Sequence, residues 1–350
     1  PITVGRFFQM IMKILVVLMG LNVFYLVGAE IVAGFLILLI LIYFFRGNPL
    51  KRPDWDYFRI YVFFAMPAVF IGVLATITEN FDKVMLQLFI GSEEVGIYTV
   101  PQRLTAFSTV IPVIIVSLLF PSFSELYSRG KFSKISFLSN QSVKYISLTL
   151  VPFVVFFFIF ADEVLVLLFG DDATKSSFVF QTLMVATYIN AIVLPYGVQI
   201  LSTGHLKIAF IVSIAALALN LILNTIFIPS KIFDIQMLGL GASGAALATL
   251  ISLTLRGLII KYYSFKITQT KIYHNIWKHF LGGIITAMVG LFLYEYTAWY
   301  LLFPFCITLT GVYLVVLYIF GEFGREEFEF YKSTINPYKM ESYISGELKR

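Results

Sequence analysis

The chain has 350 residues, of which 59% are hydrophobic and 13% are charged, and its formal net charge is +5. Soluble globular domains carry roughly twice that share of charged residues, so the composition excludes an ordinary soluble enzyme or nucleic-acid-binding domain. The single cysteine, Cys306, excludes a disulfide within the chain.

Apolar stretches of bilayer-spanning length follow one another along the chain. A hydrocarbon core about 30 Å thick needs about 20 residues of α-helix. Such stretches cover residues 7–27, 29–45, 60–79, 95–119, 145–161, 178–201, 208–228, 239–260, 280–297 and 300–320. The sequence therefore predicts an all-α integral membrane protein with about ten transmembrane helices.

Basic residues gather in alternate loops. Most Lys and Arg lie at the start of the chain, after the even-numbered spans and at the end of the chain, and Arg256 and Lys261 are counted with one of these loops. The opposite loops hold only Lys83, Lys175 and Lys231. Because basic loops stay in the cytoplasm, this pattern predicts a multi-pass protein of the cytoplasmic (plasma) membrane with both ends of this chain inside.

A short internal repeat relates residues 21–33 to residues 219–246, since both contain Leu-Asn followed by Gly-Ala and a leucine- and isoleucine-rich stretch. Transporters often contain such repeats, although two apolar helices can also resemble each other by chance. If the repeat holds, residues 1–46 are the last two helices of a truncated first lobe. About four further spans would then precede Pro1, and the whole protein would be a fourteen-helix transporter with two lobes.

The same reasoning divides the remaining chain. Residues 47–59 form a cytoplasmic linker, 60–262 a six-helix second lobe, 263–320 two additional helices and 321–350 a cytoplasmic tail. Mixed aromatic and basic residues in 51–59 and 123–145 predict amphipathic segments at the membrane surface. Gly239, Gly241 and Gly244 predict close packing of two membrane helices rather than a nucleotide loop, because no cytosolic strand–helix unit follows.

Two basic residues fall within predicted spans, where a charge is expensive and often functional. Arg103 lies about two turns into 95–119, and its planar guanidinium would suit a phosphate group of a substrate. An internal ion pair or snorkelling to the surface is the alternative. Lys13 lies about two turns from the inner end of 7–27, where it could bind substrate or extend its stem to the inner headgroups.

Acidic residues mark two outer segments. Glu79, Asp82 and Lys83 lie at the outer end of the third span, where they could pair across a cavity as an outer gate or form a solvated helix end. The acidic pairs 162–163 and 171–172 flank a short apolar stretch, which predicts a solvated loop or an interfacial helix.

Catalytic patterns are absent from the sequence. His205, His274 and His279 are predicted near the cytoplasmic face, without a cysteine, an HExxH motif or clustered carboxylates beside them. Solvated loop histidines are the expectation. The sequence therefore predicts a protein that is not an enzyme and has no metal and no cofactor.

Several motifs in the middle of the chain carry a resemblance to a known family. They are Asp82-Lys83-Val84-Met85-Leu86, Gly91, Val95-Gly96-Ile97-Tyr98, Arg103-Leu104, Leu119-Phe120-Pro121-Ser122-Phe123-Ser124, Leu167-Leu168-Phe169-Gly170, and Leu219-Asn220 through Ile228-Pro229 to Gly241-Ala242-Ser243-Gly244-Ala245-Ala246. These motifs resemble those of oligosaccharide-lipid flippases, the polysaccharide biosynthesis (O-antigen-type) branch of the multidrug/oligosaccharidyl-lipid/polysaccharide exporter superfamily. The resemblance covers most of residues 60–260. It implies two rocking six-helix lobes around a cation-lined cavity, with Arg103 similar to a cavity arginine of the peptidoglycan-precursor flippases.

The resemblance implies translocation of a polyprenyl-diphosphate-linked oligosaccharide by alternating access, for cell-surface polysaccharide synthesis. The implied partners are this lipid-linked oligosaccharide, membrane lipids, and the glycan polymerase and glycosyltransferases of the same pathway, with no nucleic acid. An ion-coupled multidrug exporter of the same superfamily is the alternative, and it would need a buried carboxylate that the predicted spans do not offer. A membrane glycan polymerase or ligase would need a large basic outer loop, whereas the predicted outer loops are short and acidic.

Overall fold

The computed structural model describes residues 2–46 and 54–322. Within these residues every regular element is a helix, except for one short hairpin in which β1 (Lys231–Ile232) pairs with β2 (Ile235–Gln236). The all-α fold expected from the sequence is therefore confirmed. The chain separates into two compact units, residues 1–63 and 64–350, which are considered one at a time below.

The first unit contains a helical hairpin of α1 (Ile2–Leu18) and α2 (Val23–Phe45). Gly20 has a φ of +65°, which suits glycine, and it turns the chain. The side chain of Asn22 then accepts a hydrogen bond from the Phe24 backbone N–H at 3.2 Å and caps α2. The turn thus lies inside the stretch 7–27, so the predicted end of that span is wrong.

The helix α3 (Trp55–Phe89) begins in the first unit and continues into the second. The further elements of the second unit, in chain order, are α4 (Ser92–Ser108), α5 (Val110–Ser128), α6 (Phe132–Ile159), α7 (Ala161–Phe169), the 3₁₀ helix η1 (Asp171–Ser176), α8 (Ser177–Ser202), α9 (Leu206–Phe227), the hairpin, α10 (Gly241–Thr268), α11 (Ile276–Tyr294), the 3₁₀ helix η2 (Trp299–Leu301) and α12 (Leu302–Ile319).

Two boundaries predicted for this unit are wrong. The span expected over 95–119 is interrupted at Thr109, between α4 and α5. The helix α6 already starts at Phe132, so the span expected over 145–161 begins earlier than predicted. An interfacial role for residues 123–145 stays a prediction. The short apolar stretch 164–169 lies in α7, a separate helix of nine residues that is too short to cross a bilayer.

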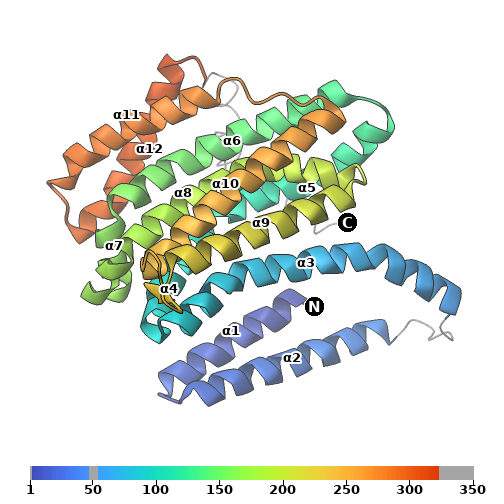
Figure 1. Cartoon of the computed structure of the whole chain (residues 1–350), viewed down its shortest axis with the longest axis horizontal. Helices are drawn as coiled ribbons and strands as arrows, with labels where there is room; N and C mark the ends of the chain where they lie inside the picture. Colours follow the sequence, from blue (N-terminus) through green and yellow to red (C-terminus); the bar gives the residue numbers. More distant parts are fainter. Residues whose placement is uncertain (1, 47–53, 323–350) are drawn as a thin grey trace, which may run out of the picture. The chain divides into compact units, whose positions relative to one another are not determined.

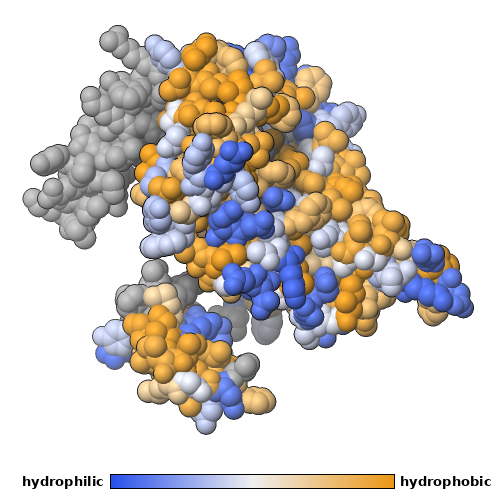
Figure 2. Space-filling model, turned by 90° about the vertical axis from the view of Figure 1, so that its left-hand side faces the viewer, coloured by the Kyte–Doolittle hydropathy of each residue, from blue (hydrophilic) through white to orange (hydrophobic). Residues whose placement is uncertain are grey.

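Eight helices in the described part of the chain are long and apolar enough to cross a membrane. They cover residues 24–43, 110–128, 132–159, 171–202, 206–227, 241–268, 276–294 and 299–319. Bulky side chains such as Phe107, Leu118 and Phe303 are largely exposed, and Figure 2 shows broad apolar areas. Apolar surface of this extent fits contact with lipid rather than water. The chain is a multi-pass membrane protein.

Within the second unit, α8 packs against α4, α5, α6 and α10, and α9 packs against α10 (Figure 1). A Cβ atom at Gly244 would lie 2.7 Å from the Phe227 carbonyl oxygen, so glycine lets α10 approach the end of α9. This confirms the prediction of a glycine-mediated helix contact. At Gly241, the start of α10 is capped by Glu94 of α4, whose Oε2 accepts a hydrogen bond from the Ala242 N–H at 2.6 Å.

Candidate functional site

A buried carboxylate, Asp82, lies where four helices of the second unit meet. It is 2% exposed and lies about two turns before the end of α3. The Tyr98 hydroxyl of α4 donates to Asp82 Oδ2 at 2.5 Å, and the Thr249 hydroxyl of α10 donates to the same atom at 2.7 Å. Asn224 of α9 donates from Nδ2 to Asp82 Oδ1 at 2.6 Å. These donors offset part of the cost of burying a carboxylate.

The position of Asp82 corrects two expectations. The sequence ends the third span at residue 79, whereas α3 continues to Phe89 and places Asp82 inside the unit. Asp82 is therefore buried, whereas Glu79 is exposed, and both line one cavity. The expectation that no span offers a buried carboxylate is also wrong. A gating role for Glu79, Asp82 and Lys83 stays a prediction.

A cavity of about 450 Å³ extends from Asp82 between α3, α4, α8, α9 and α10. It reaches Leu201 and Ala209, on either side of the turn between α8 and α9, so it runs along much of the unit. Its polar lining consists of Thr78, Glu79, Asp82, Tyr98, Gln102, Thr105, Thr187, Asn190, Ser213, Asn220, Thr249, Ser252 and Arg256.

Arg256 lines this cavity near the middle of α10. Its Nη2 donates to Asn190 Oδ1 at 2.7 Å, near the middle of α8. Arg256 and Lys261 lie within α10, which continues to Thr268, so they are not loop residues as the sequence predicts. Their place on the cytoplasmic side stays a prediction. The Nζ of Lys261 lies 3.6 Å from the centre of the Tyr196 ring and donates to the Thr270 and Lys271 carbonyl oxygens.

Three buried polar atoms near this cavity have no hydrogen-bond partner in the described residues. They are Asn224 Oδ1, Ser252 Oγ and Arg256 Nε. Buried polar atoms in proteins are nearly always satisfied, by protein groups, water or ligands. Their grouping around one polar cavity indicates a hydrated or ligand-binding space rather than a packing core.

Arg103 lies on an exposed side of α4. Lys83 of α3 interacts electrostatically with both Arg103 and Glu79. Gln102 donates from Nε2 to the Glu79 carbonyl oxygen at 2.9 Å and fastens α4 to α3 at this place. In the described part of the chain no carboxylate lies within 4 Å of Arg103. The two cations therefore present positive charge on the surface where α3 and α4 meet, and a substrate-binding role for Arg103 stays a prediction.

Lys13 lies in the first unit, where it pairs with Glu30 of α2 at 2.6 Å. Glu30 also accepts a hydrogen bond from Gln9. The sequence does not predict this pair, because residues 7–27 are expected to form one helix without the turn at Gly20. About half of each charged side chain is exposed, so the pair contributes little stability in water. Substrate binding by Lys13 stays a prediction.

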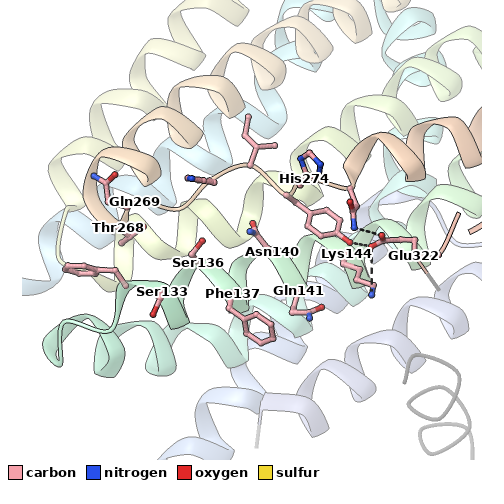
Figure 3. Close-up of a pocket in the computed structure, with 16 residues that line it drawn as sticks. Ser133, Ser136, Phe137, Asn140, Gln141, Lys144, Thr268, Gln269, His274 and Glu322 are labelled. Carbon is pink, nitrogen blue, oxygen red and sulfur yellow. Dashed lines mark hydrogen bonds and ion pairs between the residues drawn. The ribbon is translucent and has the colours of Figure 1, made fainter. Parts of the chain in front are cut away.

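A second cavity, of about 810 Å³, lies between the start of α6 and the segment 268–275. Figure 3 shows Lys144 and Glu322 together at one end of this cavity. Glu322 is 4% exposed and pairs with Lys278 at 3.3 Å and Lys144 at 3.9 Å. It also accepts hydrogen bonds from Tyr273 and from Asn275, the latter at 2.7 Å. These contacts fasten the end of α12 to α6 and α11.

One of the three histidines is not the solvated loop residue that the sequence predicts. His279 is fully buried in α11, where its Nδ1 lies 2.6 Å from the Tyr313 hydroxyl oxygen, so it is not a solvated loop residue. Across residues 2–46 and 54–322, no three His, Cys, Asp or Glu side chains gather in a way that could hold a metal ion.

Comparison with known proteins identifies the family of this chain. The profile of the family described as "Polysaccharide biosynthesis protein" matches residues 2–177. The chain belongs to this family. It is 23% identical over 217 residues to the Haloferax volcanii protein named "Probable low-salt glycan biosynthesis flippase Agl15", and 23% identical over 181 residues to "Probable flippase AglR" of the same organism. These matches cover 62% and 51% of this chain, but only 44% and 36% of the relatives.

A solved structure shares the fold. The chain superposes on "Lipid II flippase MurJ, inward closed conformation" with a TM-score of 0.73 and 16% identity, over 90% of this chain and 65% of that chain. The fold is therefore MurJ-like, as the family resemblance implied. The named relatives are flippases rather than enzymes. The chain spans less than half the length of the curated relatives in these matches and less than two thirds of the MurJ chain.

Proposed function

We propose that the protein is a flippase that moves a polyprenyl-diphosphate-linked oligosaccharide across the cytoplasmic membrane by alternating access. The family and the shared fold support transport of a glycan precursor. A diphosphate and its sugars cannot cross about 30 Å of hydrocarbon unaided, because each polar group would lose its hydration. The protein must therefore offer polar and cationic groups along the path.

The observation that carries the proposal is the exposed position of Arg103 beside Lys83 on α4, a helix that packs against α8 and α10. A guanidinium is costly at membrane depth unless an anionic or strongly polar group meets it. Arg103 has no carboxylate within 4 Å in the part of the chain that the structure describes. A diphosphate fits this need, because the planar fork of donors matches phosphate oxygens.

The decisive experiment is substitution of Arg103 in the full-length native protein. Arg103→Ala should reduce export of the lipid-linked glycan at least tenfold while membrane abundance stays nearly unchanged, because the side chain is exposed in the bundle. Arg103→Lys should restore export only in part, because an ammonium cannot bind two oxygens in the planar geometry. Export is measured by surface glycan labelling and abundance by immunoblot of membranes.

The control for this experiment is the removal of one positive charge elsewhere on the protein surface. Lys207, an exposed residue in the first turn of α9, offers a matched removal of one positive charge, and Lys207→Ala should leave export unchanged. Normal export by a well-expressed Arg103→Ala protein would contradict the substrate assignment. Loss of the protein from the membrane would instead indicate a structural role for Arg103.

An ion-coupled exporter of other amphiphiles is the second candidate, and Asp82 favours it. A buried carboxylate surrounded by hydroxyl and amide groups from three other helices can exchange a proton or a small cation, and this exchange could drive either kind of transport. The two candidates differ in cargo. Transport of a lipid-linked oligosaccharide but not of cationic drugs in reconstituted vesicles would support the flippase.

A further inference from the structure

We propose that the cavity beside Arg256 binds a small monovalent inorganic anion, with chloride as its ordinary occupant. Two hydrogen-bond donors on one face of α10 carry this inference. Arg256 Nε is buried without a partner, and Ser252 Oγ, one turn earlier and in a residue only 4% exposed, is also buried without a partner. Residues four apart on a helix are neighbours on its surface, so both groups serve the same space.

A third donor comes from the opposite helix. Asn190 of α8 accepts the hydrogen bond from Arg256 through its Oδ1, which leaves its Nδ2 as a further donor at this place. All three residues line the same cavity of about 450 Å³. A guanidinium, an amide and a hydroxyl form a donor set that suits an acceptor-only ligand.

The positive charge of Arg256 favours an anion over water as the ligand of this cavity. A guanidinium at the middle of a membrane-length helix needs an opposite charge or strongly polar groups nearby, and an anion supplies the charge. Among the described residues no carboxylate lies within 4 Å of Arg256. Thr249, which contacts Asp82, precedes Arg256 by two turns of α10, or about 10 Å along the axis, too far for Asp82 to be its direct partner.

The same charges limit the ligand to a single negative charge. The next cation along α10, Lys261, is engaged with the Tyr196 ring and two carbonyl oxygens. One guanidinium therefore balances one charge, and a phosphate dianion would bring a second charge with no cation to meet it. Chloride is monovalent and small enough for this space.

Asp82 and Glu79 should both oppose this anion, because the two carboxylates line the same cavity as Arg256. Neutralising Asp82 with a proton or a cation would strengthen anion binding, and anion binding would favour the neutralised Asp82 by the same factor. This coupling between Asp82 and the anion distinguishes binding at the site from a nonspecific effect of salt on the protein surface.

The test is chloride binding to the purified full-length protein in detergent, measured by thermal unfolding at constant ionic strength as gluconate is replaced by chloride. The wild type should show a saturable rise in Tm. Arg256→Gln should weaken the chloride affinity at least about tenfold, and Ser252→Ala, which removes one neutral donor, should weaken it by about threefold to tenfold. Asp82→Asn should strengthen it.

Two controls keep the outcomes separate. Lys207→Gln removes an exposed positive charge outside the cavity and should leave the chloride response unchanged. If Arg256→Gln does not fold, Ser252→Ala and anomalous scattering from bromide at Arg256 decide the matter. The absence of a chloride response in the wild type, or an equal response in Arg256→Gln, would overturn the proposal. Because the assay measures binding and not transport, its failure is distinct from failure of the proposed flippase function.

Discussion

The second unit contains two buried polar networks that share α10, one around Gln199 and one around Asp82, and they differ in how completely their atoms are paired. At the shared end of α8 and α10, Gln199 donates from Nε2 to Ser139 Oγ at 2.6 Å and to Thr270 Oγ1 at 3.0 Å. Its Oε1 accepts hydrogen bonds from Ser264 and Thr268. Neither polar atom of the Gln199 side chain is left without a partner.

The network around Asp82 and the cavity beside it leave polar atoms unpaired. Asn224 Oδ1, next to Asp82, and Ser252 Oγ and Arg256 Nε, in residues that line the cavity, have no partner among the described residues. A fully paired network holds helices in one arrangement, whereas a partly paired one leaves polar groups for a ligand. We infer that the Gln199 network keeps α6, α8 and α10 together while the network around Asp82 responds to ions.

The largest effect is expected from breaking the Gln199 network. Gln199→Leu removes four hydrogen bonds and leaves the buried Ser264 hydroxyl without its partner, which should lower the free energy of unfolding by about 2–4 kcal/mol. Ser202→Ala on the same helix, where the hydroxyl bonds only the Gln199 carbonyl oxygen, is the matched control and should change stability little. Denaturant titration in mixed micelles measures both. Equal stability of Gln199→Leu and wild type would contradict a structural role for this network.

A different kind of loss is expected from Asp82→Asn. The asparagine keeps the shape and one oxygen acceptor, and it removes the cost of a buried charge, so the free energy of unfolding should stay within about 1 kcal/mol of wild type. Transport should nevertheless fall at least tenfold, because the exchangeable negative charge is gone. Parallel unfolding and vesicle transport measurements check this. A strongly destabilised Asp82→Asn protein would instead indicate that Asp82 has a structural role, as Gln199 does.

Much of the fold could be predicted from the sequence, because hydrophobic length alone identifies membrane helices. The errors occur where a helix extends beyond its apolar stretch. Asp82 and Lys261 lower the local hydropathy, so the spans predicted from the sequence end at 79 and 260, before α3 and α10 end. A prediction based on hydropathy therefore misses charged residues that lie inside the helices of the unit.

The partners of these charges could not be predicted at all. Asn224 and Thr249 contact Asp82 from sequence distances of 142 and 167 residues. One signal was available: Asn220 and Asn224 lie one turn apart in an otherwise apolar helix, and unpaired amides are costly inside a membrane. Their presence predicts a buried polar group on a neighbouring helix, although not which one.

The smallest effect, and the sharpest comparison, comes from a matched pair of buried serines. Ser139 is fully buried and accepts the hydrogen bond from Gln199, whereas Ser252 is 4% exposed and its hydroxyl has no partner. Ser139→Ala should therefore lower the free energy of unfolding by about 1 kcal/mol, because it leaves an amide donor of Gln199 unpaired. Ser252→Ala should change it by less than about 0.5 kcal/mol in chloride-free buffer, because no protein hydrogen bond is lost. The two variants lose the same oxygen atom at similar burial, so the size of the lost side chain cannot explain a difference between them. Equal destabilisation by both, measured by denaturant titration in chloride-free micelles, would show that the two networks are alike and that the Ser252 hydroxyl has a protein partner after all.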